Sequence, residues 1–336
     1  MHTFDSPQNI CGLSAVEGSC KLIMSTKVKQ VDKLSFGYRL KTDLRRNWSI
    51  YMLIIPVLVY YVVFCYKPMY GAIIAFKEFN PTEGIWGSPW VGFEQFRKFF
   101  SNPDFFRIFR NTLAISITNI IFGFPAPIIL ALLFNELKSK KFKSIAQTVS
   151  YLPHFISLVV VCGLIKTFVS QGGIIFQMVT ALGGKNVGLL SRAECFLPVY
   201  VLSDIWQGIG WGSIIYLAAL SGVDQQLYEA AKIDGAGKWK QVIHVTIPGI
   251  MPTIIIMFIL RLGSILNVGY EKVILLYNPL IYETSDIISS YVYRVGLGGQ
   301  QWSYSSAVGL LNSVINFAIV MIANKISSKV LETSLW

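Results

Sequence analysis

Apolar residues gather along this chain into long runs that are separated by charged segments. A helix needs about 20 mostly apolar residues to cross the hydrocarbon core of a bilayer. Six runs come near this length, so each is predicted to be a membrane-spanning helix. They are residues 48–66, 109–134, 150–168, 196–220, 250–268 and 304–323. The pattern predicts an all-α polytopic membrane protein with six transmembrane helices.

Composition favours a membrane protein over a nucleic-acid-binding one. Of the 336 residues, 53% are hydrophobic and 14% are charged, whereas soluble domains carry about 25% charged residues. The formal net charge of +11 would suggest a nucleic acid partner in a soluble protein. Here the basic residues flank the apolar runs, where they orient the protein in the membrane. We therefore expect the lipid bilayer, and no nucleic acid, as a partner.

Basic residues are concentrated in alternate segments of the chain. They crowd the segments before the first run, between the second and third, between the fourth and fifth, and after the sixth. The positive-inside rule places these segments in the cytoplasm, so both termini are expected to be cytoplasmic. Residues 1–44 have no readable packing pattern and are predicted to be a poorly ordered cytoplasmic tail. Residues 45–336 then form the transmembrane domain.

The segment between the fourth and fifth runs carries the most specific motif. Residues 229–248 read EAAKIDGAGKWKQVIHVTIP. They resemble the EAA loop of ATP-binding-cassette (ABC) importer permeases, whose pattern is EAAxxDGAxxxxxFxxIxLP. The matching letters are Glu229, Ala230, Ala231, Asp234, Gly235, Ala236 and Pro248. From average residue usage, such a set of matches occurs by chance on the order of 10⁻⁸ per window. Three apolar residues, Val242, Val245 and Ile247, replace the Phe, Ile and Leu of the pattern.

Local chemistry explains the layout of this loop. Asp224 can cap a short helix over residues 225–234, and Gly235 can take the left-handed conformation that ends it. A second short helix is predicted over residues 238–246, with Pro248 ending it and leading into the fifth span. The expected result is a rigid helix–turn–helix that projects into the cytoplasm.

The resemblance implies the fold and the partners of a type I ABC importer permease. In that family the EAA loop inserts into a groove on the ATPase subunit, so the seven matching residues are expected to couple ATP hydrolysis to movement of the spans. The implied partners are a second homologous permease, two ATPase subunits and an extracytoplasmic solute-binding protein. ATP and Mg²⁺ belong to the ATPases, so this chain is expected to bind no cofactor and no metal. The implied location is the bacterial inner (cytoplasmic) membrane.

Sequence similarities that are less specific than the EAA motif indicate the cargo. Residues 67–71, 76–81, 84–92, 151–157 and 291–296 resemble sugar permeases that take up complex saccharides, including alginate-importer permeases. The resemblance covers nearly the whole chain beyond its N-terminal tail. It implies an oligosaccharide or polysaccharide substrate without identifying the sugar.

Polar side chains inside the predicted spans are candidates for the substrate pathway, because polar groups at membrane depth are costly and usually face a cavity or a partner. On the fourth span, Asp204, Gln207 and Trp211 share one helical face. The other candidates are Arg261, Asn267, Asn312 and Asn316. Hydrogen bonding between helices, or contact with a second permease, is an open alternative for each of them. Arg261 could pair with the carboxylate of a uronate or with Asp204.

Motifs of several other functions are missing from the sequence. The chain has no P-loop, no HExxH zinc motif and no GxSxG nucleophile elbow, so no catalytic residue is predicted and the chain is not expected to be an enzyme. One alternative keeps the importer but changes the cargo to a phosphate ester, polyamine or amino acid. Another is a transporter driven by an ion gradient, which leaves the EAA loop unexplained. A third is a membrane enzyme, for which no convergent acids, bases or metal ligands stand out.

Overall fold

The computed structural model describes residues 42–184 and 187–331 and divides into two units, Met1–Gly71 and Ala72–Trp336. Each unit is considered by itself. The predicted tail, residues 1–44, lies outside the described residues except for residues 42–44.

The first unit consists mainly of one apolar helix. α3 (Trp48–Tyr60) continues through the π-helical η1 (Tyr61–Tyr66) into α4 (Lys67–Met69), and a 3₁₀ segment, η2 (Tyr70–Phe76), follows. No residue of α3 or η1 is buried. A helix that is apolar on all sides and long enough to cross a bilayer is typical of a membrane span. Its bounds match the predicted run at residues 48–66.

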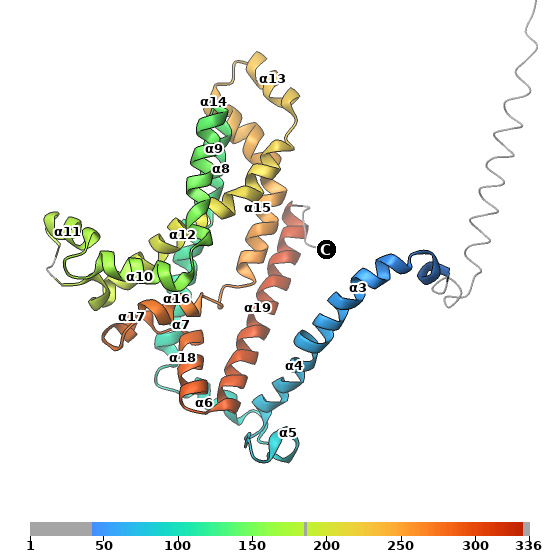
Figure 1. The fold of residues 1–336 in the computed structure, drawn as a ribbon, viewed down its shortest axis with the longest axis vertical. Coiled ribbons are helices and arrows are strands. Elements are labelled where there is room, and N and C mark those ends of the chain that lie inside the picture. Colours follow the sequence, from blue (N-terminus) through green and yellow to red (C-terminus); the bar gives the residue numbers. More distant parts are fainter. Residues whose placement is uncertain (1–41, 185–186, 332–336) are drawn as a thin grey trace, which may run out of the picture. The chain divides into compact units, whose positions relative to one another are not determined.

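Long helices form the body of the second unit (Figure 1). α7 (Phe105–Thr118), the π-helical turn η3 (Asn119–Gly123) and α8 (Pro125–Glu136) together cover the second predicted run. α12 (Ala193–Ser221) covers the fourth run and packs against α8, and α19 (Trp302–Leu331) covers the sixth. All three stretches extend a few residues beyond the predicted runs.

The third predicted run, residues 150–168, is not one helix. α9 (Lys140–Tyr151) ends inside it, the 3₁₀ turn η4 (Leu152–Phe155) bends the chain, and α10 (Leu158–Val169) begins after the bend. Pro153 lies within η4. A proline has no N–H to donate and its ring clashes with the preceding turn, so a regular helix does not continue through this point.

The fifth predicted run, residues 250–268, differs from the prediction at both ends. α14 (Lys238–Gln241), the π-helical turn η6 (Val242–Thr246) and α15 (Ile247–Leu262) form one continuous stretch. The prediction that Pro248 ends a helix is therefore wrong. Pro248 lies in the first turn of α15, and η6 before it already departs from the regular hydrogen-bonding pattern, so the missing N–H is tolerated. At the other end, the helix stops at Leu262.

Shorter elements connect the long helices. Before α7 come α5 (Gly84–Gly87) and α6 (Glu94–Phe100); between α10 and α12 come α11 (Ile174–Ala181) and η5 (Leu189–Ser191); α13 (Gln225–Ile233) precedes α14. Between α15 and α19 come α16 (Tyr270–Leu276), η7 (Pro279–Ile281), α17 (Tyr282–Ser285), α18 (Ile288–Tyr293) and η8 (Arg294–Gly298).

Among the described residues, length and hydropathy single out five candidate membrane spans. They are Trp48–Phe76, Phe105–Glu136, Leu158–Ala181, Lys238–Leu262 and Trp302–Lys329. α12 is 29 residues long, but polar residues such as Asp204 and Gln207 lower its hydropathy. The predicted all-α fold is confirmed, whereas the fourth predicted run, at α12, stays a prediction as a membrane span.

The main apolar core lies where α10, α12 and α16 meet. Its fully buried side chains include Val161 on α10, Phe196 on α12 and Val273 on α16. This packing holds the short helix α16 against α10, in a core to which α12 also contributes, and so fixes the polar side chains at the start of α16 relative to those on α12.

Candidate functional site

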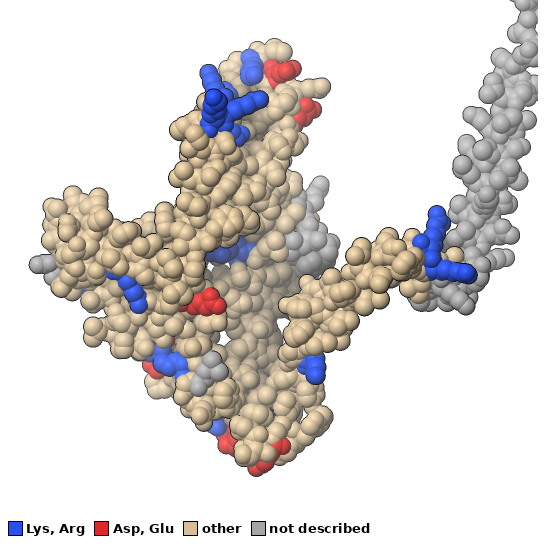
Figure 2. Space-filling view, viewed as in Figure 1, with Lys and Arg blue, Asp and Glu red and all other residues tan. Residues whose placement is uncertain are grey.

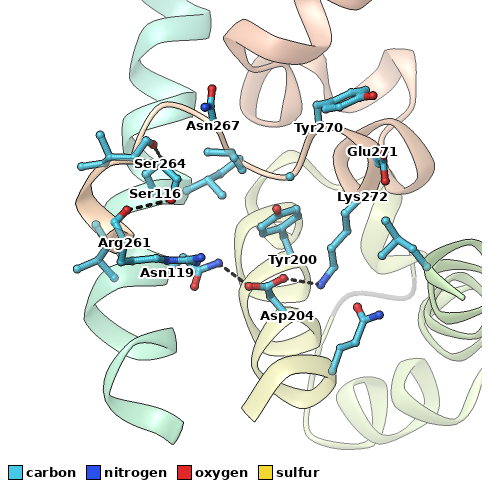
Figure 3. Close-up of a pocket in the computed structure, with 17 residues that line it drawn as sticks. Ser116, Asn119, Tyr200, Asp204, Arg261, Ser264, Asn267, Tyr270, Glu271 and Lys272 are labelled. Carbon is cyan, nitrogen blue, oxygen red and sulfur yellow. Dashed lines mark hydrogen bonds and ion pairs between the residues drawn. The ribbon is translucent and has the colours of Figure 1, made fainter. Parts of the chain in front are cut away.

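A cavity of about 390 Å³ lies in the second unit where α7, α12, the end of α15 and the start of α16 meet (Figure 3). We call it the Arg261 cavity. Its polar lining combines amide, carboxylate, guanidinium, ammonium and hydroxyl groups. These come from Ser116, Asn119, Tyr200, Asp204, Gln207, Arg261, Ser264, Asn267, Tyr270, Glu271 and Lys272. A mixed polar lining inside an apolar helical bundle is the usual setting of a transport site.

One wall of the cavity is backbone that has left the helix. After Leu262 the chain runs without helix to Gly269, inside the predicted fifth span. The Ser116 hydroxyl donates a hydrogen bond to the carbonyl of Ile265, and the backbone N–H of Leu266 donates to Asn316 Oδ1 at 3.2 Å. Irregular backbone at membrane depth is tolerated where protein buries it or where it lines a cavity, and here both conditions hold.

Asp204 is held in place by two donors. Its Oδ2 accepts from Asn119 Nδ2 at 2.8 Å, and its Oδ1 lies 3.3 Å from Lys272 Nζ. The Lys272 side chain is 4% exposed, whereas that of Asp204 is 36% exposed. Lys272 Nζ also lies 5.1 Å from the ring centroid of Tyr200, within the range of a cation–π contact. Asp204 therefore neutralises a buried lysine while its carboxylate still faces the cavity.

Arg261 is the unpaired cation of this site. Its side chain is exposed to the cavity, and within residues 42–184 and 187–331 its guanidinium has no carboxylate within ion-pair distance. The alternative that Arg261 pairs with Asp204 is thus not what the structure shows, because Asp204 pairs with Lys272. Glu271 also lines the cavity without an ion pair in the described part of the chain, and Figure 3 places it on the opposite side from Arg261.

The predicted pathway residues are only partly brought together. Four of them line the Arg261 cavity: Asp204, Gln207, Arg261 and Asn267. Asn312 Nδ2 donates to Asn267 Oδ1 at 2.7 Å, so it adjoins this cavity. Asn316 supports the unwound backbone through Leu266 instead of lining the space. Trp211 lies outside it and stacks on His154, with ring centroids 4.6 Å apart and an interplanar angle of 4°.

Several site residues were not found from the sequence. Lys272 and Glu271 follow the predicted fifth span, where charges commonly mark the membrane interface, so nothing in the pattern assigned them to a cavity. Tyr200 and Ser116 read as ordinary span residues. The signal that could have indicated them is their helical spacing from polar neighbours, since Tyr200 lies one turn from Asp204 and Ser116 lies one turn from Asn119.

The EAA segment forms a short capped helix at one end of the second unit (Figure 1). Asp224 Oδ1 accepts from the backbone N–H of Gln226 at 2.9 Å at the start of α13. At its end Gly235 has φ of +74°, its N–H donates to the carbonyl of Lys232, and the N–H of Ala236 donates to that of Ala231. This is the Schellman arrangement, which favours glycine at the left-handed position. The predicted cap and the predicted turn are both confirmed.

Side-chain contacts join the two halves of the EAA segment to each other and the second half to α8. The Tyr228 hydroxyl donates to Thr246 Oγ1 at 3.0 Å, and Gln241 Nε2 donates to the carbonyl of Ala236 at 2.8 Å. Lys238 Nζ lies 2.9 Å from a carboxylate oxygen of Glu136 at the end of α8. A movement of α13 is thereby linked to η6 and α8.

The outer surface of the EAA segment is open. Glu229, Ala230 and Gly235 are exposed, and so are the apolar side chains of Ile233 and Trp239. Figure 2 shows basic side chains gathered at the same end of the unit. Exposed apolar side chains in a polar rim are typical of a protein interface.

Comparison with known families decides what kind of protein this is. A family model described as "Binding-protein-dependent transport system inner membrane component" matches residues 123–330. The chain belongs to this family. The permease is therefore a membrane component of a transport system and not a catalytic subunit, as the EAA motif predicted.

Two relatives of the permease from Bacillus subtilis (strain 168) match it over most of their length. Protein LplB is 45% identical over 287 residues, or 85% of this chain and 90% of that protein. The "Polygalacturonan/rhamnogalacturonan transport system permease protein YteP" is 42% identical over 299 residues, or 89% of this chain and 93% of that protein.

A solved structure supports the fold of the permease. A chain from the crystal structure of the bacterial alginate ABC transporter in complex with alginate pentasaccharide-bound periplasmic protein matches with a TM-score of 0.81. It is 41% identical, and the match covers 88% of this chain and 100% of that one. The predicted ABC importer permease fold is confirmed by this match.

Proposed function

We propose that this permease forms half of the translocation pathway of an ABC importer for an acidic oligosaccharide or polysaccharide. The single observation that carries the proposal is the Arg261 cavity, which holds an unpaired guanidinium beside amides and a tyrosine inside a helical bundle. Sugar hydroxyls need donors and acceptors of this kind. The related transport proteins named for polygalacturonan/rhamnogalacturonan and for alginate support a saccharide as the cargo.

The charge of the cavity supports an acidic sugar. Lys272 is neutralised by Asp204, which leaves Arg261 as the group that can bind an anion. A guanidinium stays protonated at any physiological pH and forms paired hydrogen bonds with a carboxylate. A uronate residue carries such a carboxylate on its ring. The structure of a relative whose cargo is described as the acidic polysaccharide alginate supports this assignment.

The EAA segment is the proposed link to two ATPase subunits, which bind ATP and Mg²⁺. The residues that carry the coupling are Glu229, Ala230, Ala231, Asp234, Gly235, Ala236 and Pro248. Its exposed tip and its contacts with η6 and α8 suit the transfer of a rigid-body movement to the spans. The basic end of the unit lies in the cytoplasm, α12 is a sixth span, and both termini are cytoplasmic. A second permease and an extracytoplasmic solute-binding protein complete the complex.

Uptake by the assembled complex in proteoliposomes tests the cargo. Arg261→Gln keeps a polar side chain but removes the charge, so it should raise the KM for an oligouronate by roughly tenfold or more, the loss expected for an uncompensated carboxylate. A matched neutral oligosaccharide, if it is transported at all, should be affected much less. Arg261→Lys keeps the charge and should retain part of the preference.

The outcome separates charge recognition from a folding defect. If Arg261→Gln transports acidic and neutral saccharides as well as the wild type does, Arg261 does not recognise the uronate. If both substrates are lost together and Arg261→Lys shows the same loss, the arginine serves assembly and the acidic-cargo proposal fails.

A further inference from the structure

A second hollow, of about 430 Å³, adjoins the Arg261 cavity and has different chemistry. We call it the Tyr293 hollow. Its walls are the aromatic rings of Tyr270, Tyr293 and Trp302, and its floor consists of small residues of α19 and η8 such as Ser305 and Gly309. It lies around α18, at the end of the second unit opposite α13 (Figure 1).

Two of the aromatic rings are partly exposed and lie close to each other. Tyr270 is 41% exposed and Tyr293 is 45% exposed, with ring centroids 6.2 Å apart at an interplanar angle of 34°. Inclined rings at this separation form one continuous apolar surface. A pyranose ring carries C–H groups on its faces and hydroxyls around its edge, so it packs on such a surface while its hydroxyls reach polar neighbours.

An unsatisfied polar atom lies beside these rings. Asn312 Nδ2 donates to Asn267, but Asn312 Oδ1 is buried and has no hydrogen-bond partner in the described part of the chain. Rotating the Asn312 amide by 180° exchanges its oxygen and nitrogen, so one of the two atoms still lacks a partner. A buried polar atom without a partner costs about 1–3 kcal/mol, so a shift of the Asn312 side chain that brought Oδ1 to the hollow would let a sugar hydroxyl satisfy it.

The two spaces lie next to each other. Tyr270 lines both of them, and the Asn267–Asn312 hydrogen bond joins the lining of one to the lining of the other. Each volume falls within the range of about 300–1,000 Å³ that is usual for small-molecule sites. A saccharide chain long enough to pass Tyr270 would place one sugar ring in each space.

We propose that the Tyr293 hollow is a second saccharide subsite, which binds a sugar ring of a longer chain while the Arg261 cavity holds a neighbouring uronate. The proposal rests on the proposed function. It makes the permease sensitive to chain length, because a disaccharide can be held in the Arg261 cavity alone whereas longer oligosaccharides use both spaces.

Gly309 offers a way to fill the hollow without removing a contact. A Cβ added at Gly309 meets no atom within 4 Å, so Gly309→Leu places its side chain in open space of the hollow. Gly163 on α10 is the matched control, since it too is an exposed helical glycine with no atom within 4 Å of an added Cβ and lines neither space. In a second pair of variants, Tyr293→Leu removes the aromatic ring and Tyr293→Phe keeps it.

The experiment compares uptake of a uronate disaccharide and of longer oligouronates by the full complex in proteoliposomes. Gly309→Leu and Tyr293→Leu should lower kcat/KM for the longer chains by roughly tenfold or more, the scale on which extra bulk in a fitted pocket acts. The disaccharide should be taken up at the wild-type rate, and Gly163→Leu should match the wild type for both lengths. Tyr293→Phe, which keeps the ring, should lose much less uptake of the longer chains than Tyr293→Leu.

Three results would overturn the subsite. The first is wild-type uptake of every length by Gly309→Leu and Tyr293→Leu. The second is an equal loss for all lengths, which is what a general gating defect produces. The third is a lower recovery of the assembled complex with Gly309→Leu, which would mean that the second permease covers the hollow. A wild-type complex that takes up no saccharide refutes the proposed function itself.

Discussion

Replacing Asp204 by asparagine tests the internal electrostatics of the Arg261 cavity. Lys272 Nζ lies 3.3 Å from Asp204 Oδ1, and its side chain is almost fully enclosed. Asp204→Asn keeps the size of the side chain but leaves this ammonium without a counter-charge. Removing one partner of a buried ion pair costs about 3–5 kcal/mol. Because Asp204 itself is partly open to the cavity, we expect the lower end of this range, ~3 kcal/mol, or a factor of about a hundred in the folded-to-unfolded ratio.

The assay is the thermal stability of the purified complex in mild detergent, followed as the loss of intact complex on size-exclusion chromatography. Asp204→Asn should unfold at a clearly lower temperature than the wild type. Adding Lys272→Met should restore most of the loss, because the double variant buries no unpaired charge. Glu271→Gln is the control, since Glu271 lines the same cavity without an ion pair in the described residues. Wild-type stability of Asp204→Asn, or no recovery in the double variant, would refute the reasoning.

Two further predictions concern the EAA turn and the segment between α15 and α19. Gly235→Val forces a β-branched residue into φ of +74° and should abolish uptake without lowering the amount of protein in the membrane. Gly235→Asn should retain uptake, because asparagine tolerates this conformation. Equal uptake by both variants, measured against the protein level in the membrane, would contradict this prediction. Arg294 donates hydrogen bonds to both carboxylate oxygens of Asp286, at 3.1 and 2.7 Å, and this raises the pKa of Arg294 further above its ordinary value. Because the pKa of Arg294 is higher in the folded protein than in the unfolded one, the stability it contributes is present below the unfolded-state pKa and is lost only as the pH rises through the folded-state pKa. The difference in unfolding temperature between the wild type and Arg294→Gln should therefore stay constant between about pH 5 and 9.

Most bounds of the long helices could be predicted from the sequence because runs of mostly apolar residues mark them. The first run matches α3 and η1, the second falls within the stretch from α7 to α8, and the runs on α12 and α19 miss only the helix ends. Asp224 and Gly235 were predictable for another reason: a side-chain cap and a left-handed turn depend on a few neighbouring residues and not on the tertiary fold.

The irregular parts of the spans depend on contacts that a single sequence does not reveal. The stretch after Leu262 is apolar enough to read as helix, yet it is unwound because Ser116 and Asn316, from distant helices, bind its backbone. Pro248 reads as a helix stop, yet the π-helical η6 accommodates it. The end of α9 approaches α12 so closely that a Cβ at Gly210 would lie 2.0 Å from the carbonyl oxygen of Ser150.

The candidate site was predictable only to the level of residue types. The sequence indicates which polar residues lie at membrane depth, and four of the seven line one cavity. It does not indicate their partners: Lys272 lies 68 residues from Asp204 in the sequence, and Trp211 stacks on His154 outside the cavity. Pairing of this kind follows from the shared apolar core of α10, α12 and α16.

The most direct test of the central claim is uptake of a labelled oligouronate by proteoliposomes that contain this permease, its partner permease, the ATPase subunits and the solute-binding protein. We expect uptake only when ATP and Mg²⁺ are present on the cytoplasmic side, and no uptake when an ion gradient is the only energy source. Uptake by the permease in liposomes without ATPase subunits or ATP would contradict the account and indicate a gradient-driven carrier.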